Sequence, residues 1–67
     1  MTFDIATEEE TDGRWIAEID AIPGALVYGR TRSEAVQGVQ ALVLRVMADR
    51  LEHAEAGELV NVTFRAA

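Results

Sequence analysis

The sequence predicts an α+β domain in the order β-β-β-α-β, with one helix packed on a sheet rich in antiparallel strand pairs. Three observations support this prediction. Short runs of alternating apolar and polar residues occur before residue 30 and again after residue 58. A long stretch between them repeats its apolar residues at helical spacing. The chain has only 67 residues, so we expect one domain that covers residues 1–67.

The first two strands are expected to form a hairpin. Apolar and polar side chains alternate over residues 2–6 and again over residues 14–20, with Ile16 as an exception on the polar side. Asp12-Gly13 lies between the two runs and is a dipeptide typical of tight turns. The two strands should therefore pair antiparallel.

A third strand is predicted over residues 26–28. Pro23-Gly24 precedes it and predicts a turn, and Gly29 closes it. The run Leu-Val-Tyr is rich in residues that favour strands.

The helix is predicted to begin at Arg32 and to run to about Glu55. Thr31 and Glu34 have the spacing of a capping box, in which the Thr31 hydroxyl accepts a hydrogen bond from the Glu34 amide and the carboxylate returns one to the Thr31 amide. Gly57 is placed to end the helix.

Alternation returns at residues 59–64, which predicts a closing strand. Val60, Val62 and Phe64 fall on one face of that strand.

The predicted helix is too long for its sheet. About 24 helical residues span roughly 36 Å, whereas strands of six or seven residues span about 20 Å. The apolar arc of the helix is also wider than one sheet-facing stripe requires. We therefore expect a homo-oligomer, a dimer or a tetramer, with contacts at Leu44, Met47 and Leu51.

The charge balance favours a basic protein as the partner. The chain has 12 acidic residues and 6 arginines, no lysine, and a net charge of −6, so its field repels a nucleic-acid backbone. We expect no direct DNA binding. The acidic hairpin, Glu8, Glu9, Glu10 and Asp12, is the candidate partner-binding site because its charge would steer a cationic protein toward it. A solvated hairpin tip is the alternative interpretation.

Candidate residues for catalysis are few. Asp49 and His53 have a spacing that could place both on one helix face as a metal pair, but two ligands do not complete a site. Asp4, Glu18 and Asp20 could gather a divalent cation, although a solvated sheet face explains them better. We expect no catalytic residues, no metal and no cofactor, and hence a protein that is not an enzyme.

The cellular compartment is predicted from two features that the sequence lacks, a membrane-spanning run and a secretory signal. No apolar run approaches the roughly 20 residues of a membrane-spanning helix, and residues 1–4 lack the features of a secretory signal. We expect a cytoplasmic protein with no membrane partner.

Three segments together resemble the HicB-type antitoxins of bacterial toxin-antitoxin systems. They are an aromatic-x-Ala strand at residues 15–19, a Pro-Gly turn at 22–24, and Gly-x-Thr-x-x-Glu-Ala at 29–35, which opens the helix. The residues that carry the resemblance, which we expect to act as scaffold, are Trp15, Ala17, Pro23, Gly24, Gly29, Thr31, Glu34 and Ala35.

The resemblance implies a partial ribonuclease-H-like domain that is not itself a nuclease. Such domains bind and neutralise a small basic RNA-cleaving toxin, HicA, and they commonly form dimers or larger assemblies. Many members also carry a C-terminal DNA-binding domain, for which this sequence has no residues after the predicted last strand, so we expect none. The alternative is a solitary homo-oligomeric HicB-like domain with no toxin partner and a structural or small-ligand role.

Overall fold

A computed structural model describes residues 1–54 and 59–66 and confirms the α+β prediction. One helix packs on a four-stranded sheet with strand order β3-β2-β1-β4. The first three strands pair antiparallel and β4 runs parallel to β1. The elements in chain order are β1 (Thr2–Glu9), β2 (Trp15–Glu18), β3 (Leu26–Gly29), α1 (Arg32–Glu52) and β4 (Thr63–Ala66).

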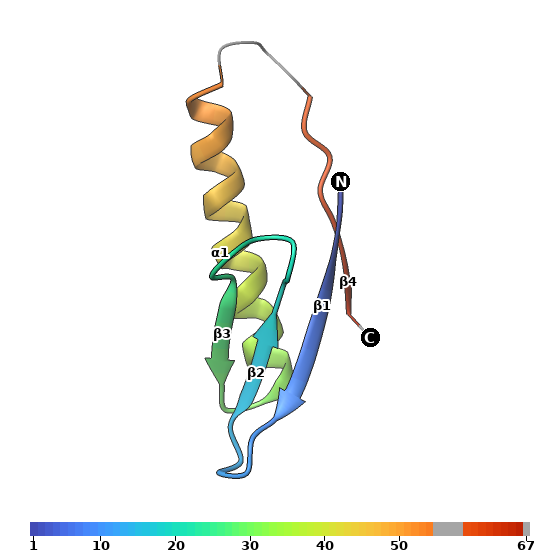
Figure 1. The fold of residues 1–67 in the computed structure, drawn as a ribbon, viewed down its shortest axis with the longest axis vertical. Helices are drawn as coiled ribbons and strands as arrows, with labels where there is room; N and C mark the ends of the chain where they lie inside the picture. Colours follow the sequence, from blue (N-terminus) through green and yellow to red (C-terminus); the bar gives the residue numbers. More distant parts are fainter. Residues whose placement is uncertain (55–58, 67) are drawn as a thin grey trace.

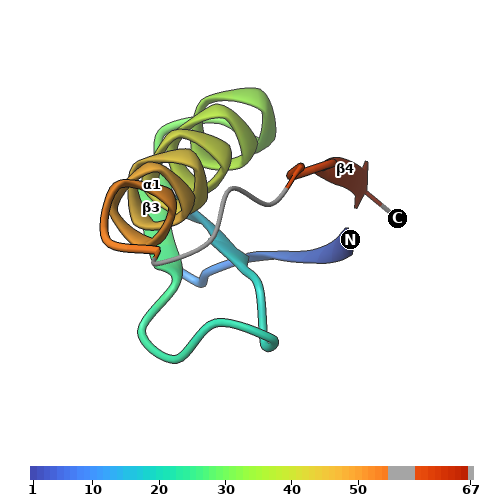
Figure 2. The ribbon, with the colours of Figure 1, turned by 90° about the horizontal axis from the view of Figure 1, so that it is seen from above.

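The helix covers one face of the sheet, toward the β3 side, and β4 forms the far edge (Figures 1 and 2). Every second side chain along the strands points toward the helix. These side chains are buried against the apolar side chains on the sheet-facing side of α1. The core consists of Phe3, Ile5, Ala17, Ile19, Ile22, Ala25, Ala35, Val39, Val43 and Met47. Trp15 and Phe64, which the alternation also assigns to the core, are only partly buried against it.

β1 is longer than predicted. The alternating run covers residues 2–6, but Glu8 pairs with Ile16 and Glu9 with Trp15, so the strand extends through Glu9. The Glu10 amide then donates to the Arg14 carbonyl over 2.7 Å and closes the hairpin. These backbone pairs need no apolar side chain, which is why the alternation ends earlier than the strand.

β2 is shorter than its apolar pattern. Ile19 lies beyond the strand but is almost fully buried, and its amide donates to the Ala25 carbonyl over 3.0 Å. The predicted turn is confirmed at Gly24, whose φ of +81° is a backbone conformation that L side chains rarely adopt.

The helix begins at Arg32, as predicted. The Thr31 hydroxyl accepts a hydrogen bond from the Glu34 amide over 3.0 Å, which supplies one half of the capping box. The helix ends at Glu52 with His53 as its C-cap, three residues before the predicted end. Gly57, the predicted stop, lies outside the described residues.

Gly29 lets the start of α1 approach the sheet closely. A Cβ at this position would lie 2.6 Å from the backbone nitrogen of Ala35, closer than real Cβ contacts come. Ala35 itself is fully buried. Both positions therefore have a packing role where the helix starts.

The closing strand lies later in the chain than predicted. β4 covers Thr63–Ala66 instead of residues 59–64, and its register pairs Thr2 with Thr63. In this register residues 59–62 lie beyond the start of β1, where the Met1 ammonium donates a hydrogen bond to the Asn61 carbonyl over 2.6 Å. Leu59 is accordingly 98% exposed. The face prediction is confirmed in part, since Phe64 packs against Phe3 with ring centroids 5.9 Å apart.

The predicted overhang of the helix is present. Figure 1 shows the C-terminal half of α1 continuing past the ends of β2 and β3. The 21 residues of α1 span about 31 Å, the four residues of β2 about 13 Å and the eight residues of β1 about 27 Å, so the overhang is large beside β2 and small beside β1. Burial falls along the helix for the same reason, from fully buried Val39 and Val43 to exposed Arg50.

Candidate protein-interaction face

The sheet face opposite the helix mixes acidic and apolar side chains. Because Phe3, Ala17 and Val27 turn toward the helix, their neighbours along each strand turn away from it. We call this surface the uncovered face. Its members on the four strands are Asp4, Ala6, Glu8, Ile16, Glu18, Leu26, Tyr28 and Arg65.

Strand register places acids and apolar side chains side by side on the uncovered face. One cross-strand row is Glu8, Ile16 and Tyr28. The next row is Ala6, Glu18 and Leu26. Each of the two glutamates therefore has apolar neighbours, and opposite side chains at this spacing contact one another.

Two large apolar side chains of this face remain exposed. Leu26 is 39% and Tyr28 is 47% exposed, and both lie on the edge strand β3. Ile16, the exception in the strand pattern, lies between β1 and β3 and is half-buried. Exposed apolar area beside charged groups is typical of protein-binding surfaces.

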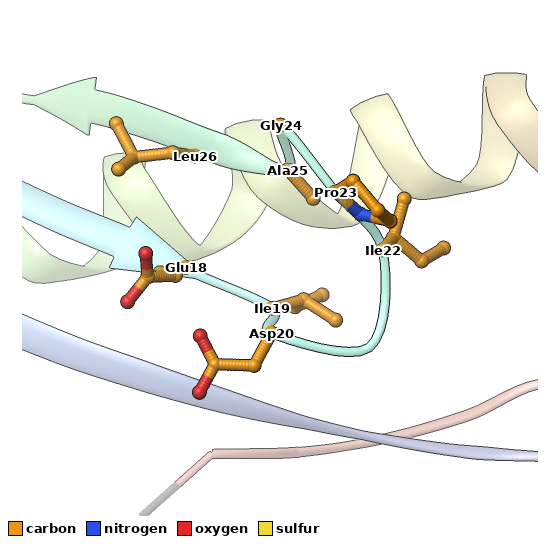
Figure 3. Close-up of a pocket in the computed structure, with 8 residues that line it drawn as sticks. All are labelled: Glu18, Ile19, Asp20, Ile22, Pro23, Gly24, Ala25 and Leu26. Atoms are coloured by element: carbon orange, nitrogen blue, oxygen red, sulfur yellow. The ribbon is translucent and has the colours of Figure 1, made fainter.

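Glu18 and Asp20 border two open hollows. One hollow, of about 350 Å³, lies in the β2–β3 connection and includes Pro23 and Leu26 in its lining. The other, of about 370 Å³, lies across β1 beside Asp4. Figure 3 shows the carboxylates of Glu18 and Asp20 extending to the same side of the chain, while Ile19 and Ile22 extend to the other.

Asp4 is neutralised within the chain. Arg65 donates from Nε to Asp4 Oδ1 over 2.8 Å and from Nη2 to Oδ2 over 3.3 Å. The hydrogen bond to Asp4 and its charge raise the pKa of the Arg65 guanidinium. No described residue forms an ion pair with Glu8, Glu18 or Asp20, so these carboxylates are open to an external cation.

A guanidinium already stacks at the hairpin end of this face. The Arg14 guanidinium carbon lies 4.6 Å from the centroid of the Tyr28 ring. Arg14 Nε donates to Asp12 Oδ2 over 2.8 Å, and the Arg14 amide donates to Asp12 Oδ1 over 3.0 Å. The hydrogen bond from the Arg14 amide is the main cause that lowers the pKa of Asp12 below its ordinary value, and the hydrogen bond from the Arg14 side chain lowers it further.

The four acids of the predicted hairpin site do not form one cluster. Glu8 lies on the uncovered face, whereas Glu9 pairs with Trp15 and turns to the opposite side. Glu10 is half-buried at the start of the turn, and Asp12 forms an ion pair with Arg14. The structure therefore brings only Glu8 onto the same surface as Glu18.

Residues 1–54 and 59–66 contain no cluster of metal ligands. Nowhere in these ranges do three His, Cys, Asp or Glu side chains come together in a way that could hold a metal ion. Asp4 is bound to Arg65, and His53 Nδ1 lies 2.8 Å from the Asp49 carbonyl oxygen as part of the exposed helix end. His53 Nδ1 also lies 3.5 Å from Asp49 Oδ1, so these two side chains do share one helix face, without a third ligand among the described residues.

The predicted oligomer contacts divide into two kinds. Leu44 is 50% and Leu51 is 48% exposed, as an interface between copies requires. Met47 is instead buried against the chain's own core, because it lies nearer the sheet on the helix circumference. Leu51 and Met47 also border a small hollow of about 210 Å³ beside Met1 and Val60.

Comparisons of the chain with protein-family models, with curated proteins and with solved structures found no match. Within the described ranges, no helix has the length and apolar character needed to cross a bilayer.

Sequence reasoning missed the apolar half of the site. The strand pattern assigns Glu18 and Asp20 to a solvated face. Leu26 and Tyr28 alternate with the inward Val27, which was the available signal. Alternation alone could not show which of the two sets the helix covers.

Proposed function

We propose that this chain is a HicB-like antitoxin module that binds a small basic RNA-cleaving protein of the HicA type and neutralises it by occlusion. The observation that carries the proposal is the uncovered face, where unpaired carboxylates and exposed apolar side chains share one surface. Such a surface complements a cationic protein, and the described residues form no cluster that could hold a metal ion. The sequence segments at residues 15–19, 22–24 and 29–35 supply the family resemblance.

The net charge of −6 agrees with this partner class. Opposite charge accelerates the encounter of two proteins, and it disfavours association with a nucleic-acid backbone. The proposal therefore includes a cytoplasmic location beside the toxin and no direct DNA binding.

The test uses a small basic protein encoded next to this chain in its own genome. The two proteins are co-purified, and RNA cleavage by the basic protein is measured with and without this chain. We expect a salt-sensitive complex and stoichiometric loss of cleavage. A neighbour that cleaves RNA equally well in the presence of excess chain would refute the proposal.

A second function is favoured by the helix. Leu44 and Leu51 remain about half exposed on α1. A solitary homo-oligomer with a structural or small-ligand role would cover them without any toxin. A stable oligomer with no basic protein encoded nearby would support this second function over the first.

A further inference from the structure

The uncovered face and the hairpin tip are two separate acidic surfaces, and only one of them is built to hold a cation. Glu9 and Glu10 belong to the tip, while Glu18 and Asp20 lie at the opposite end of β2. Glu9 pairs with Trp15, which is half-buried, whereas Glu18 pairs with Leu26, which is exposed. A cation that docks beside Leu26 loses more water and so interacts more strongly.

An arginine of the chain itself already lies on this face. Arg14 places its guanidinium over the Tyr28 ring, so an arginine side chain fits the surface beside β3. Arginine stacks on aromatic rings and pairs with carboxylates through a planar fork, whereas the ammonium of lysine is a compact, strongly hydrated point charge. The apolar stem of an arginine can also lie along an exposed leucine.

We propose that the partner docks on the uncovered face, not on the hairpin tip, and that this face selects arginine side chains whose guanidinium groups pair with Glu18 and Asp20. The two carboxylates are supplied by the same end of β2 and border both hollows on this side. Leu26 supports the stem of the bound arginine, as Tyr28 supports Arg14. The inference rests on the proposed function, because it assigns the surface through which that function is exerted.

Two double variants with the same charge change test the location. Glu18→Gln/Asp20→Asn and Glu9→Gln/Glu10→Gln each remove two negative charges, so long-range attraction falls equally in both. The probe is a hexa-arginine peptide, titrated calorimetrically in about 0.1 M salt, where surfaces more than about 10 Å apart are largely screened from each other. We expect the first variant to weaken binding at least about fivefold and the second less than about twofold. Equal losses, or a larger loss at the tip, would overturn the proposal.

The choice of arginine is tested with hexa-lysine, which carries the same charge. We expect hexa-arginine to bind the wild-type chain at least about threefold more tightly, and Leu26→Ser to reduce this ratio. Equal affinities for the two peptides would contradict the arginine selection. Far-UV circular dichroism and the thermal midpoint confirm that each variant is folded, since all the substituted side chains are exposed or half-buried.

Amide chemical shifts distinguish the remaining outcomes. Hexa-arginine should move the signals of residues 16–20 and 26–28 in the isotope-labelled chain. If dilution without peptide moves the same signals, a second copy occupies this face and the proposal is wrong. If the basic toxin is bound and inhibited as well by Glu18→Gln/Asp20→Asn as by wild type, the docking inference fails while the proposed function stands. If the peptide results hold but no toxin is inhibited, the proposed function fails while the assignment of an arginine-binding face stands.

Discussion

Replacing Leu51 with glutamate tests whether the overhanging helix joins copies of the chain. Leu51 is 48% exposed in one copy. Full burial of a leucine stabilises by about 1.5–3 kcal/mol, so covering the remaining half contributes roughly 0.7–1.5 kcal/mol per copy. A symmetric dimer contains this contact twice, which amounts to about 1.5–3 kcal/mol. Leu51→Glu should therefore raise the dimer dissociation constant by roughly 10- to 150-fold, and more where two carboxylates approach each other.

Sedimentation velocity over a range of concentrations measures this change. Gln37→Glu is the matched control, because it adds the same charge at an exposed position in the first half of α1. Leu44→Glu should act in the same direction as Leu51→Glu, since Leu44 is equally exposed. Circular dichroism should show a folded domain in each case. A wild-type chain that stays monomeric at every concentration, or a Leu51→Glu variant that assembles as well as wild type, would refute the overhang argument.

Three further predictions concern the fold and the hairpin. Val43→Ala should lower the free energy of unfolding by about 2–3 kcal/mol in urea titrations, because Val43 is fully buried; a loss well under 1 kcal/mol would mean that the helix packs loosely. Gly29→Ala should cost at least about 1 kcal/mol, since its Cβ would meet the Ala35 backbone; unchanged stability would contradict that close approach. Arg14→Ala should raise the pKa of Asp12 only part of the way to its ordinary value in an NMR titration, because the backbone amide at position 14 still donates. Because the pKa of Asp12 is lowered in the folded chain, its carboxylate stabilises the fold at pH values above the ordinary pKa of aspartate. This contribution disappears as the pH falls through the pKa of the folded chain, so the stabilities of wild type and Arg14→Ala should converge in acid.

The local signals in this sequence predict the start of the helix and the turns well. Thr31 caps the helix through its own hydroxyl, and Gly24 adopts a backbone conformation that few other residues tolerate. Both are decided by residues that are close in sequence. The element order follows from them together with the periodicity of the apolar residues.

The errors occur where distant parts of the chain set the outcome. β4 begins at Thr63 because β1 begins at Thr2, and no pattern within residues 59–66 contains that register. Glu8 and Glu9 belong to β1 because β2 continues beside them, although their side chains resemble those of a loop. In both cases tertiary pairing decides the boundary.

The proposed binding surface is predictable in charge but not in position. The surplus of acids predicts a cationic partner. The acids of the hairpin lie close together in sequence, which favours the hairpin as the predicted binding site. Glu18 and Asp20 are separated by the buried Ile19, so the strand must form before they share a side. The contribution of Leu26 becomes visible only once β3 is known to lie beside β2.

The two proposed surfaces lie on opposite sides of the sheet, which makes their effects separable. Leu51 belongs to the helix that covers one face, while Glu18 and Asp20 border the other. Substitutions at distant sites with no shared partner usually add within a few tenths of a kcal/mol. The triple variant Leu51→Glu/Glu18→Gln/Asp20→Asn should therefore dissociate into monomers as readily as Leu51→Glu, and each monomer should bind hexa-arginine as weakly as Glu18→Gln/Asp20→Asn does. Measuring the oligomer by sedimentation and the peptide affinity per chain by calorimetry separates the two effects. If monomerisation by Leu51→Glu alone abolished peptide binding, the binding face would have to be completed by a second copy, and the assignment to one sheet would be wrong.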